Sequence, residues 1–228
     1  MNTFIKSDED QVILKVLVGS RAHGLHNPDS DSDFRAVFTV PTAKILGLNS
    51  NVKNAQWIEG DVDNTSWEIG HFLRLATKCN PTILETFLSP IVETSDFGQE
   101  LRNLFPAIWN SRGVRDAFVG YGRNQQKKFL DGKDGRPNKF AVAYARSLFN
   151  AHELLTTGTF TINIGSSEFG KMLREWKAGN YKMGDVIDTC YELETKVNAA
   201  YDANPDKETD MAKVNEFLLK VRHSNFNM

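Results

Sequence analysis

The feature that most constrains this chain is an apolar run that ends abruptly in a glycine. Residues 12–18 are Val-Ile-Leu-Lys-Val-Leu-Val, a composition typical of a strand buried on both faces. Gly19-Ser20 and a polar loop follow, and residues 31–40 then predict a second strand that opens on Asp31-Ser32-Asp33. We therefore expect two adjacent strands, one ending in a glycine turn and the next beginning with two carboxylates.

The chain changes character after about its first hundred residues. Residues 56–66 predict a third strand, and short helices are expected from residue 67 to the Asn80-Pro81 break and over 82–88. Beyond Pro106, helical spacing of apolar residues predicts helices over 114–130, 138–155, 183–201 and 211–221. The expected fold class is α/β (α+β), with a sheet-containing domain in residues 1–105 and an α-helical domain in residues 106–228.

Composition excludes several classes of protein. Hydrophobic residues make up 40% of the 228 and charged residues 25%, so the chain can bury a core. The formal charge of −2 indicates no general affinity for nucleic acid, so any basic surface must be local. Cys79 and Cys190 lie in apolar helical patterns and predict buried free thiols. Without a signal peptide or an apolar run of about 18 residues, a cytoplasmic protein with no membrane contact is expected.

Asp31 and Asp33 are the first candidates for chemistry. Residues two apart on a strand point to the same side, about 7 Å from each other by strand rise. Mg²⁺ favours carboxylate oxygens together with substrate phosphates, and a third carboxylate from a neighbouring strand would complete a site for two ions on a triphosphate. Aspartates of an ordinary turn are the alternative. The order of strand, Gly-Ser, polar loop, Asp-x-Asp and second strand favours the metal-binding interpretation.

Gly19 and Ser20 are the second set of candidates. A glycine directly after a strand lets the backbone approach a phosphate closely. The N–H groups that follow and the Ser20 hydroxyl are suitable donors to phosphate oxygens. A phosphate-binding turn beside a metal-binding pair provides the parts that nucleotidyl transfer needs.

A resemblance extends this interpretation. Gly-Ser-Arg-Ala-His-Gly-Leu at 19–25 and Pro-Asp-Ser-Asp-Ser-Asp-Phe-Arg at 28–35 resemble the RlaP family of DNA polymerase β-like nucleotidyltransferases, a family of the RNA repair pathway. Residues 72–85, 139–158 and 210–222 are also similar to it. His23 stands where many relatives have tyrosine. The resemblance implies a mixed-sheet nucleotidyltransferase core followed by a helical domain, dependence on two Mg²⁺ (or Mn²⁺) ions, and transfer of a nucleoside monophosphate from an NTP with release of pyrophosphate.

The third carboxylate is assigned by the same resemblance. Matching back from Phe72 places it at Asp63, so Asp31, Asp33 and Asp63 are the expected metal ligands and catalytic residues. Asp61 shares a strand face with Asp63, and Glu68 lies nearby. For these two we prefer an exposed strand-end residue and a first-turn helix acid that the helix dipole favours.

Basic residues complete the expected nucleotide site, which comprises Gly19, Ser20, Arg21, Arg35 and Lys139. Arg21 follows the phosphate turn and has a planar guanidinium suited to phosphate. Arg35 alternates onto the face of Asp31 and Asp33, with a salt bridge to those aspartates as its alternative. In the resembled superfamily a helical-domain lysine often closes over the triphosphate, which favours Lys139.

Two further residues stay open at this point. Arg146 lies seven residues after Lys139 and near the same helix face, with a solvated surface as the alternative. Tyr121 stands between two glycines, where it is suited either to stack on a base or to pack in the core.

The expected function depends on which molecule accepts the nucleoside monophosphate. An RNA 3′ end, such as tRNA or a broken RNA, would need a positive groove, whereas a partner protein would make the chain an AMP-transferring regulator. A small molecule is the third acceptor class. A catalytically silent nucleotide-binding scaffold is the alternative outside enzymes, but it has no need for both Asp31 and Asp33. A metal-dependent nuclease would need more clustered His and Asp residues than the chain has.

Overall fold

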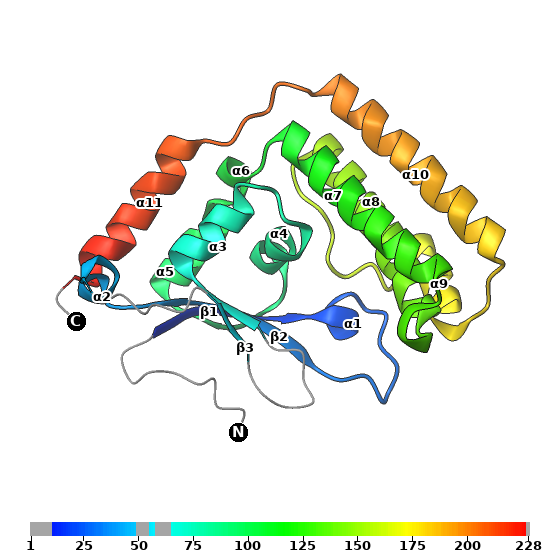
Figure 1. Cartoon of the computed structure of the whole chain (residues 1–228), viewed down its shortest axis with the longest axis horizontal. Helices are drawn as coiled ribbons and strands as arrows, with labels where there is room; N and C mark the ends of the chain where they lie inside the picture. Colours follow the sequence, from blue (N-terminus) through cyan, green and yellow to red (C-terminus); the bar gives the residue numbers. More distant parts are fainter. Residues whose placement is uncertain (1–10, 49–54, 58–64, 227–228) are drawn as a thin grey trace.

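The computed structural model describes residues 11–48, 55–57 and 65–226. Its sheet has the strand order β3-β4-β2-β1-β5. β2 and β4 are parallel, whereas the other neighbouring pairs are antiparallel, so the sheet is mixed as expected. In Figure 1 the helices gather on one side of this sheet. The strands are β1 (Gln11–Val18), β2 (Asp33–Thr39), β3 (Ala55–Trp57), β4 (Thr65–Glu68) and β5 (Ile91–Thr94).

β1 confirms the strand predicted from the apolar run. It pairs with β2 on one side and β5 on the other, so it lies inside the sheet. Leu14 and Val16 are fully buried, which explains the near absence of polar residues along it. The register places Val18 opposite Asp33, and this pairing brings the residue that follows, Gly19, to the start of β2.

The third predicted strand is only partly within the described residues. β3 and β4 occupy its two ends and pair with each other, while residues 58–64 lie outside the described residues. β5 was not predicted, because its four residues are all exposed and carry no apolar alternation. It forms an edge of the sheet beside β1.

The helices follow the predicted spacing closely in the second half of the chain. α7, α8 and α10 pack against one another, and Figure 1 shows them as long neighbouring helices. α9 was not predicted and lies against α8. The helices are α1 (Gly19–Ala22), α2 (Thr42–Leu46), α3 (Ile69–Ala76), α4 (Pro81–Leu88), α5 (Asp96–Asn103), α6 (Phe105–Ile108), α7 (Ser111–Leu130), α8 (Pro137–Thr157), α9 (Glu168–Ala178), α10 (Met183–Ala203) and α11 (Met211–Ser224), with a 3₁₀ turn η1 (Lys133–Gly135).

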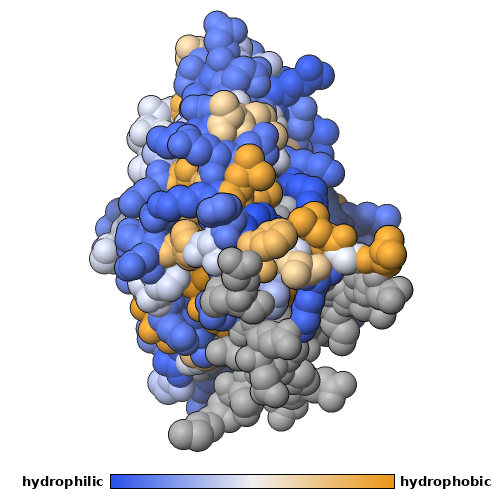
Figure 2. Space-filling model, turned by 90° about the vertical axis from the view of Figure 1, so that its left-hand side faces the viewer, coloured by the Kyte–Doolittle hydropathy of each residue, from blue (hydrophilic) through white to orange (hydrophobic). Residues whose placement is uncertain are grey.

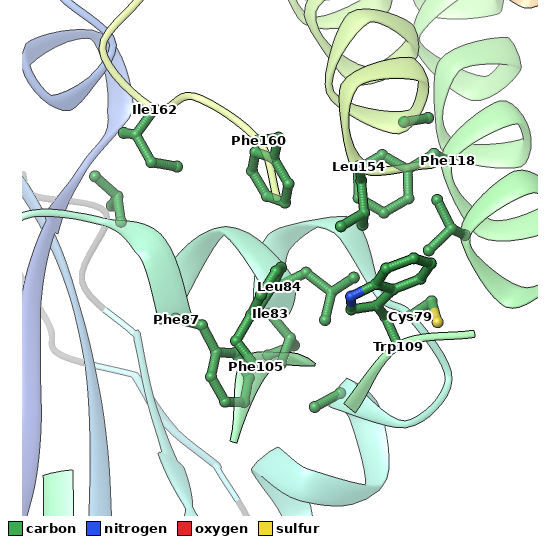
Figure 3. Packing of buried hydrophobic residues seen from close by; sticks show 14 of the residues in the cluster. Cys79, Ile83, Leu84, Phe87, Phe105, Trp109, Phe118, Leu154, Phe160 and Ile162 are labelled. Atoms are coloured by element: carbon green, nitrogen blue, oxygen red, sulfur yellow. The ribbon is translucent and has the colours of Figure 1, made fainter. Parts of the chain in front are cut away.

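One hydrophobic core connects the sheet side with the long helices. Phe160, in the segment after α8, lies with its ring centroid 6.2 Å from those of both Phe105 and Phe118. Figure 3 shows its ring above α4, with Leu154 of α8 to its right and Leu84 of α4 below. The expected boundary at residue 105 falls within α6, and the division into two folding units stays a prediction.

Both cysteines are buried free thiols, as predicted. Burial raises the pKa of Cys79 to about 11 and that of Cys190 to about 12. Neither side chain lines the pocket described below. The thiols therefore belong to the core and take no part in the site.

The C-terminal helix returns to the sheet. Thr42 donates its backbone N–H to the Asn225 carbonyl and its hydroxyl, at 2.6 Å, to the Arg222 carbonyl. Arg222 also lies 2.6 Å from Glu68. Figure 2 views the side that carries α2 and α11, where hydrophilic side chains cover most of the face and apolar ones lie among them. Among the described helices, none combines the length and the apolar character that crossing a bilayer requires.

Candidate active site

A pocket of about 840 Å³ opens where the start of β2 faces α8. It contains acidic residues from the loop before β2 and from α4, and basic residues from β2, α8 and α9. The residues that line it are Gly19, Ser20, His23, Leu25, Asp29, Ser30, Asp31, Asp33, Arg35, Glu85, Tyr121, Gly135, Arg136, Pro137, Asn138, Lys139, Val142, Ala143, Arg146 and Lys177.

Gly19 and Asp33 are in close contact at one end of the pocket. Gly19 has a φ of +69°, and a Cβ at this position would lie 2.2 Å from Asp33 Oδ2. Only glycine fits both the backbone conformation and the space. The glycine therefore allows the backbone of the turn to lie directly against a carboxylate.

Asp31 and Asp33 both line the pocket, but they differ in setting. β2 begins at Asp33, so Asp31 belongs to the preceding loop and not to the strand as predicted. Asp31 is exposed and Asp33 is half-buried. Their two carboxylates supply the oxygen ligands that Mg²⁺ prefers, and the N–H groups of the neighbouring turn suit the phosphate that such an ion accompanies, so these residues fit the ion.

Gly19 and Ser20 line the pocket, whereas Arg21, the third residue of the turn, does not. Arg21 is directed elsewhere, and its Nε donates to the Ser30 carbonyl at 2.9 Å. This bond ties the turn to the loop that carries Asp31. The contact observed for Arg21 is thus structural support of the site.

The predicted third carboxylate, Asp63, and its alternative Asp61 lie outside the described residues. Glu68 is described and pairs with Phe38, five residues along β2 from Asp33 and so about 17 Å away by strand rise. Its side chain accepts hydrogen bonds from the N–H groups of Gly70 and His71 as the N-cap of α3. Glu68 is therefore a helix-capping acid. Within residues 11–48, 55–57 and 65–226, no group of three or more His, Cys, Asp or Glu side chains is arranged to hold a metal.

Glu85 binds three other side chains that line the pocket. Its Oε1 accepts from His23 Nε2 at 2.5 Å and from Arg146 Nη1 at 2.8 Å, and its Oε2 accepts from Arg35 Nη1 at 2.6 Å. We call Glu85, His23, Arg35 and Arg146 the Glu85 cluster. Arg35 was expected to pair with Asp31 or Asp33 if it made a salt bridge, but its carboxylate partner is Glu85.

Charges within the Glu85 cluster shift its two titrating groups. Burial opposes ionisation of Glu85, but the charges of Arg146 and Arg35 and the hydrogen bond from His23 outweigh it and hold its pKa well below the usual range. Burial, and then the charge of Arg146, lower the pKa of His23, although Glu85 opposes this. The imidazole is therefore neutral at pH 7, and its Nε2–H donates to the ionised carboxylate.

Basic residues line the opposite side of the pocket. Lys139, one of the predicted nucleotide-binding residues, is exposed near the start of α8 beside Arg136. Lys177 of α9 donates from Nζ to the Leu25 carbonyl at 2.9 Å. Burial and the neighbouring charge of Lys139 lower the pKa of Lys177. Tyr121 also lines the pocket, and burial raises its pKa.

Residues just before and within α9 form hydrogen bonds with the backbone at the end of the glycine turn. Ile164 donates its N–H to the His23 carbonyl at 3.1 Å, and Arg174 Nη1 donates to the carbonyls of Gly24 and Gly165. A Cβ on Gly24 would lie 3.0 Å from Gly165 Cα, so the two backbones touch. Sequence reasoning missed this support, because the two segments lie far apart in the chain.

The fold and the pocket define a class. A mixed sheet in which a glycine turn contacts the aspartate that opens the next strand, followed by a helical region, is the architecture of a polymerase β-like nucleotidyltransferase core. The family model of RlaP, described as the RNA repair pathway DNA polymerase beta family, matches residues 1–173. The chain belongs to this family, and the family suggests nucleotidyltransferase activity.

Two curated relatives are similar to the chain. It is 26% identical over 232 residues to "Uncharacterized protein YcgL" of Bacillus subtilis (strain 168), an alignment that covers 92% of this chain and 89% of that protein. It is also 26% identical over 134 residues to "Uncharacterized 38.9 kDa protein in nrdC-mobD intergenic region" of Enterobacteria phage T4. That alignment covers 52% of this chain and 39% of the phage protein.

Proposed function

We propose that the chain is a metal-dependent nucleotidyltransferase that transfers a nucleoside monophosphate from an NTP to an acceptor hydroxyl. The observation that carries this proposal is the contact between the Gly19 turn and Asp33 in a pocket that also contains Asp31 and several basic side chains. A phosphate-binding turn, a pair of carboxylates and cations on the facing helices are the parts that transfer from a triphosphate requires.

The acidic residues would hold Mg²⁺ or Mn²⁺. We assign Asp31, Asp33 and, from the sequence, Asp63 as the ligands of two ions. Ions held there would neutralise the triphosphate and activate the attacking hydroxyl. Gly19 and Ser20 bind the β- and γ-phosphates, and Arg35 and Lys139 contribute positive charge. For Arg21 we keep only the positioning of the loop through Ser30.

The reaction is an in-line displacement. The acceptor oxygen bonds to the α-phosphorus while the bond from that phosphorus to the bridging oxygen of the β-phosphate breaks, so pyrophosphate leaves. The hydroxyl proton passes to a carboxylate, for which we propose Asp63. The basic residues of the pocket stabilise the negative charge that moves onto pyrophosphate.

For the acceptor we propose the 3′ hydroxyl of an RNA. Exposed Arg136 lines the pocket 3.6 Å from Asp134, and Lys133 is exposed three residues before it. With exposed Lys139 they give this stretch a net positive charge, which attracts a polyanionic backbone. The description of the family names RNA repair. A partner protein as acceptor is the second candidate, and the same assay separates the two.

The test is a transfer assay with each α-³²P NTP, Mg²⁺ or Mn²⁺, and three acceptors: tRNA, nicked RNA and a cell lysate. We expect label on RNA, and a loss of at least about a thousandfold in Asp31→Asn and Asp33→Asn, because about 4 kcal/mol of transition-state stabilisation disappears. Asp206→Asn, in an exposed turn far along the chain, is the matched control. Equal transfer by the control and the Asp33 variant would refute the proposal, and label on lysate protein alone would replace RNA as acceptor.

A further inference from the structure

Glu85 is a buried carboxylate on a mostly apolar helix. α4 turns Ile83, Leu84 and Phe87 into the core, yet Glu85 on the same helix is only 4% exposed. An ion in such a place destabilises a protein unless opposite charges surround it. The Glu85 cluster supplies them from three other elements, since His23 follows α1, Arg35 lies on β2 and Arg146 lies on α8.

The cluster contains more positive than negative charge. Two guanidinium groups face one carboxylate, and His23 is neutral at pH 7, so one positive charge is left over. Within the described part of the chain, both arginines bond to protein through Nη1 alone. No acceptor among the described residues takes their Nε–H and Nη2–H groups, which therefore suit phosphate oxygens.

Both arginines reach the pocket. Their side chains are each 19% exposed, and both line the cavity that also contains Gly19 and Asp33. Arg35 lies two residues beyond Asp33 on β2, on the same face of the strand. Planar guanidinium groups with several N–H donors suit phosphate oxygens better than a point charge does.

We propose that Arg35 and Arg146 form a subsite for the triphosphate of the NTP, and that Glu85 is the positioning residue that holds the two guanidinium groups beside each other. The proposal rests on the proposed function for the identity of the substrate. Because Glu85 also binds the His23 ring, and the His23 backbone N–H donates to the Gly19 carbonyl at 3.1 Å, it fixes the glycine turn relative to the same arginines. One carboxylate thus aligns three parts of the phosphate site.

Two roles for Glu85 predict opposite results. If the carboxylate only reduced the positive charge of the pocket, Glu85→Gln would strengthen the binding of an anion. If it positions the arginines, Glu85→Gln weakens binding, because glutamine keeps one acceptor oxygen for two guanidinium groups and loses the charge that orders them. Anion affinity therefore separates positioning from simple charge, and a purely structural role would leave affinity unchanged in the folded variant.

The experiment is calorimetry of the full chain with inorganic tripolyphosphate, with and without Mg²⁺. We expect Arg146→Met to bind at least about tenfold more weakly and Glu85→Gln about three- to tenfold more weakly, since hydrogen bonds between charged groups are lost. The double variant should bind more weakly than Arg146→Met, because Glu85 also holds Arg35, but by less than the two single losses multiplied together, because part of its effect passes through Arg146. Arg112→Met and Glu216→Gln, which are exposed on α7 and α11, are the matched controls.

Three results would overturn the inference: no binding by the wild type in either condition, unchanged affinity in Arg146→Met, or equal or tighter binding in Glu85→Gln. Thermal unfolding checks that each variant is folded. If Glu85→Gln does not fold, Arg35→Met joins Arg146→Met, and unchanged affinity in either one overturns the inference.

The outcome is independent of the transfer assay, because tripolyphosphate has no nucleoside to transfer. A chain that binds tripolyphosphate through Arg146 but transfers no label refutes the proposed function and supports the subsite. If the wild type transfers label and Arg146→Met keeps its tripolyphosphate affinity, the proposed function is supported and the subsite is refuted.

Discussion

Glu68 and Glu85 are both buried carboxylates that meet arginines from distant parts of the chain, yet their surroundings differ. Glu68 is 3% exposed, caps α3 through the N–H groups of Gly70 and His71, and lies 2.6 Å from Arg222 of α11. We call these four residues the Glu68 cluster. There, one carboxylate faces one guanidinium, and the charges balance.

In the Glu85 cluster the charges do not balance, and the surplus lies in the pocket. The Glu68 cluster is about five residues along the sheet from Asp33 and lines no part of that pocket. A buried ion pair is weak evidence for either stability or function by itself. The two clusters therefore differ in charge balance and in exposure to a cavity, and on our proposal these differences distinguish a pair that only stabilises the fold from one that positions a binding site.

The largest expected effect separates the clusters by stability. Arg222→Met leaves Glu68 buried without a cation and should lower the free energy of unfolding by about 3–5 kcal/mol. Arg146→Met leaves Glu85 with Arg35 and His23, so a loss below about 2 kcal/mol is expected. Urea denaturation measures both. A greater loss for Arg146→Met would contradict the comparison.

The next effect concerns the glycine turn. Gly19 and Gly132 both have positive φ, +69° and +58°, so alanine strains the backbone by about 1–2 kcal/mol at either site. At Gly132 nothing lies within 4 Å of the new Cβ, whereas at Gly19 it meets Asp33. We expect Gly19→Ala to lose about a further 1 kcal/mol and to reduce transfer about a hundredfold, and Gly132→Ala to keep transfer. Equal activity in the two variants would mean that the Gly19–Asp33 contact does not matter.

The pH dependence of stability should come in part from the Glu85 cluster. The pKa of His23 is lowered in the folded chain, so below pH 6.5 the unfolded state binds a proton that the folded state does not. Stability therefore falls as pH drops below 6.5, by at most about 1.4 kcal/mol per pH unit from this group. His23→Gln should remove this slope in urea denaturation between pH 7.5 and 5.5. A slope that survives the substitution must have another source.

Glu85 acts at lower pH in the same direction. Its folded pKa lies well below 4.5, so the stability that it contributes is present above pH 4.5 and is lost as pH falls towards the folded pKa. Below pH 4.5, Glu85→Gln should therefore lose less stability than the wild type does.

The smallest expected effect concerns a hydrogen bond beside the Glu68 cluster. The Thr42 hydroxyl donates to the Arg222 carbonyl at 2.6 Å beside the Glu68 cluster. Thr42→Val removes this bond and should lower the free energy of unfolding by about 1 kcal/mol without changing transfer. A clear loss of transfer in this variant would show that the two regions are coupled.

The sequence predicted those features whose residues lie close together along the chain. The Gly19 turn and Asp33 are joined by a short loop and two paired strands, so their order along the chain sufficed to place them together. Long amphipathic helices such as α8 and α10 were predictable for the same reason, because apolar spacing repeats within each helix. β5 has no such pattern, since all four of its residues are exposed at an edge.

The Glu85 cluster was not predicted, because it is formed by contacts between residues far apart in the sequence. Its partners are separated from Glu85 by 50 to 62 residues along the chain. The available signal was a single acid among buried apolar residues on α4, where an unpaired charge is not tolerated. That signal indicates that a cation must lie nearby, but it does not indicate which one. Asp63 stays a prediction for the same site.

The hydrogen bonds between α9 and the glycine turn determine when, during synthesis, the pocket can form. Arg174 reaches the Gly24 carbonyl across 150 residues of sequence. On the ribosome, β1, β2 and all the pocket aspartates emerge long before this arginine does. A nascent chain therefore carries the chemical groups of the site for much of its synthesis without the backbone contacts that shape it. The complete pocket therefore forms late, when residues 164–177 dock, and contacts of such long sequence separation are expected to slow folding.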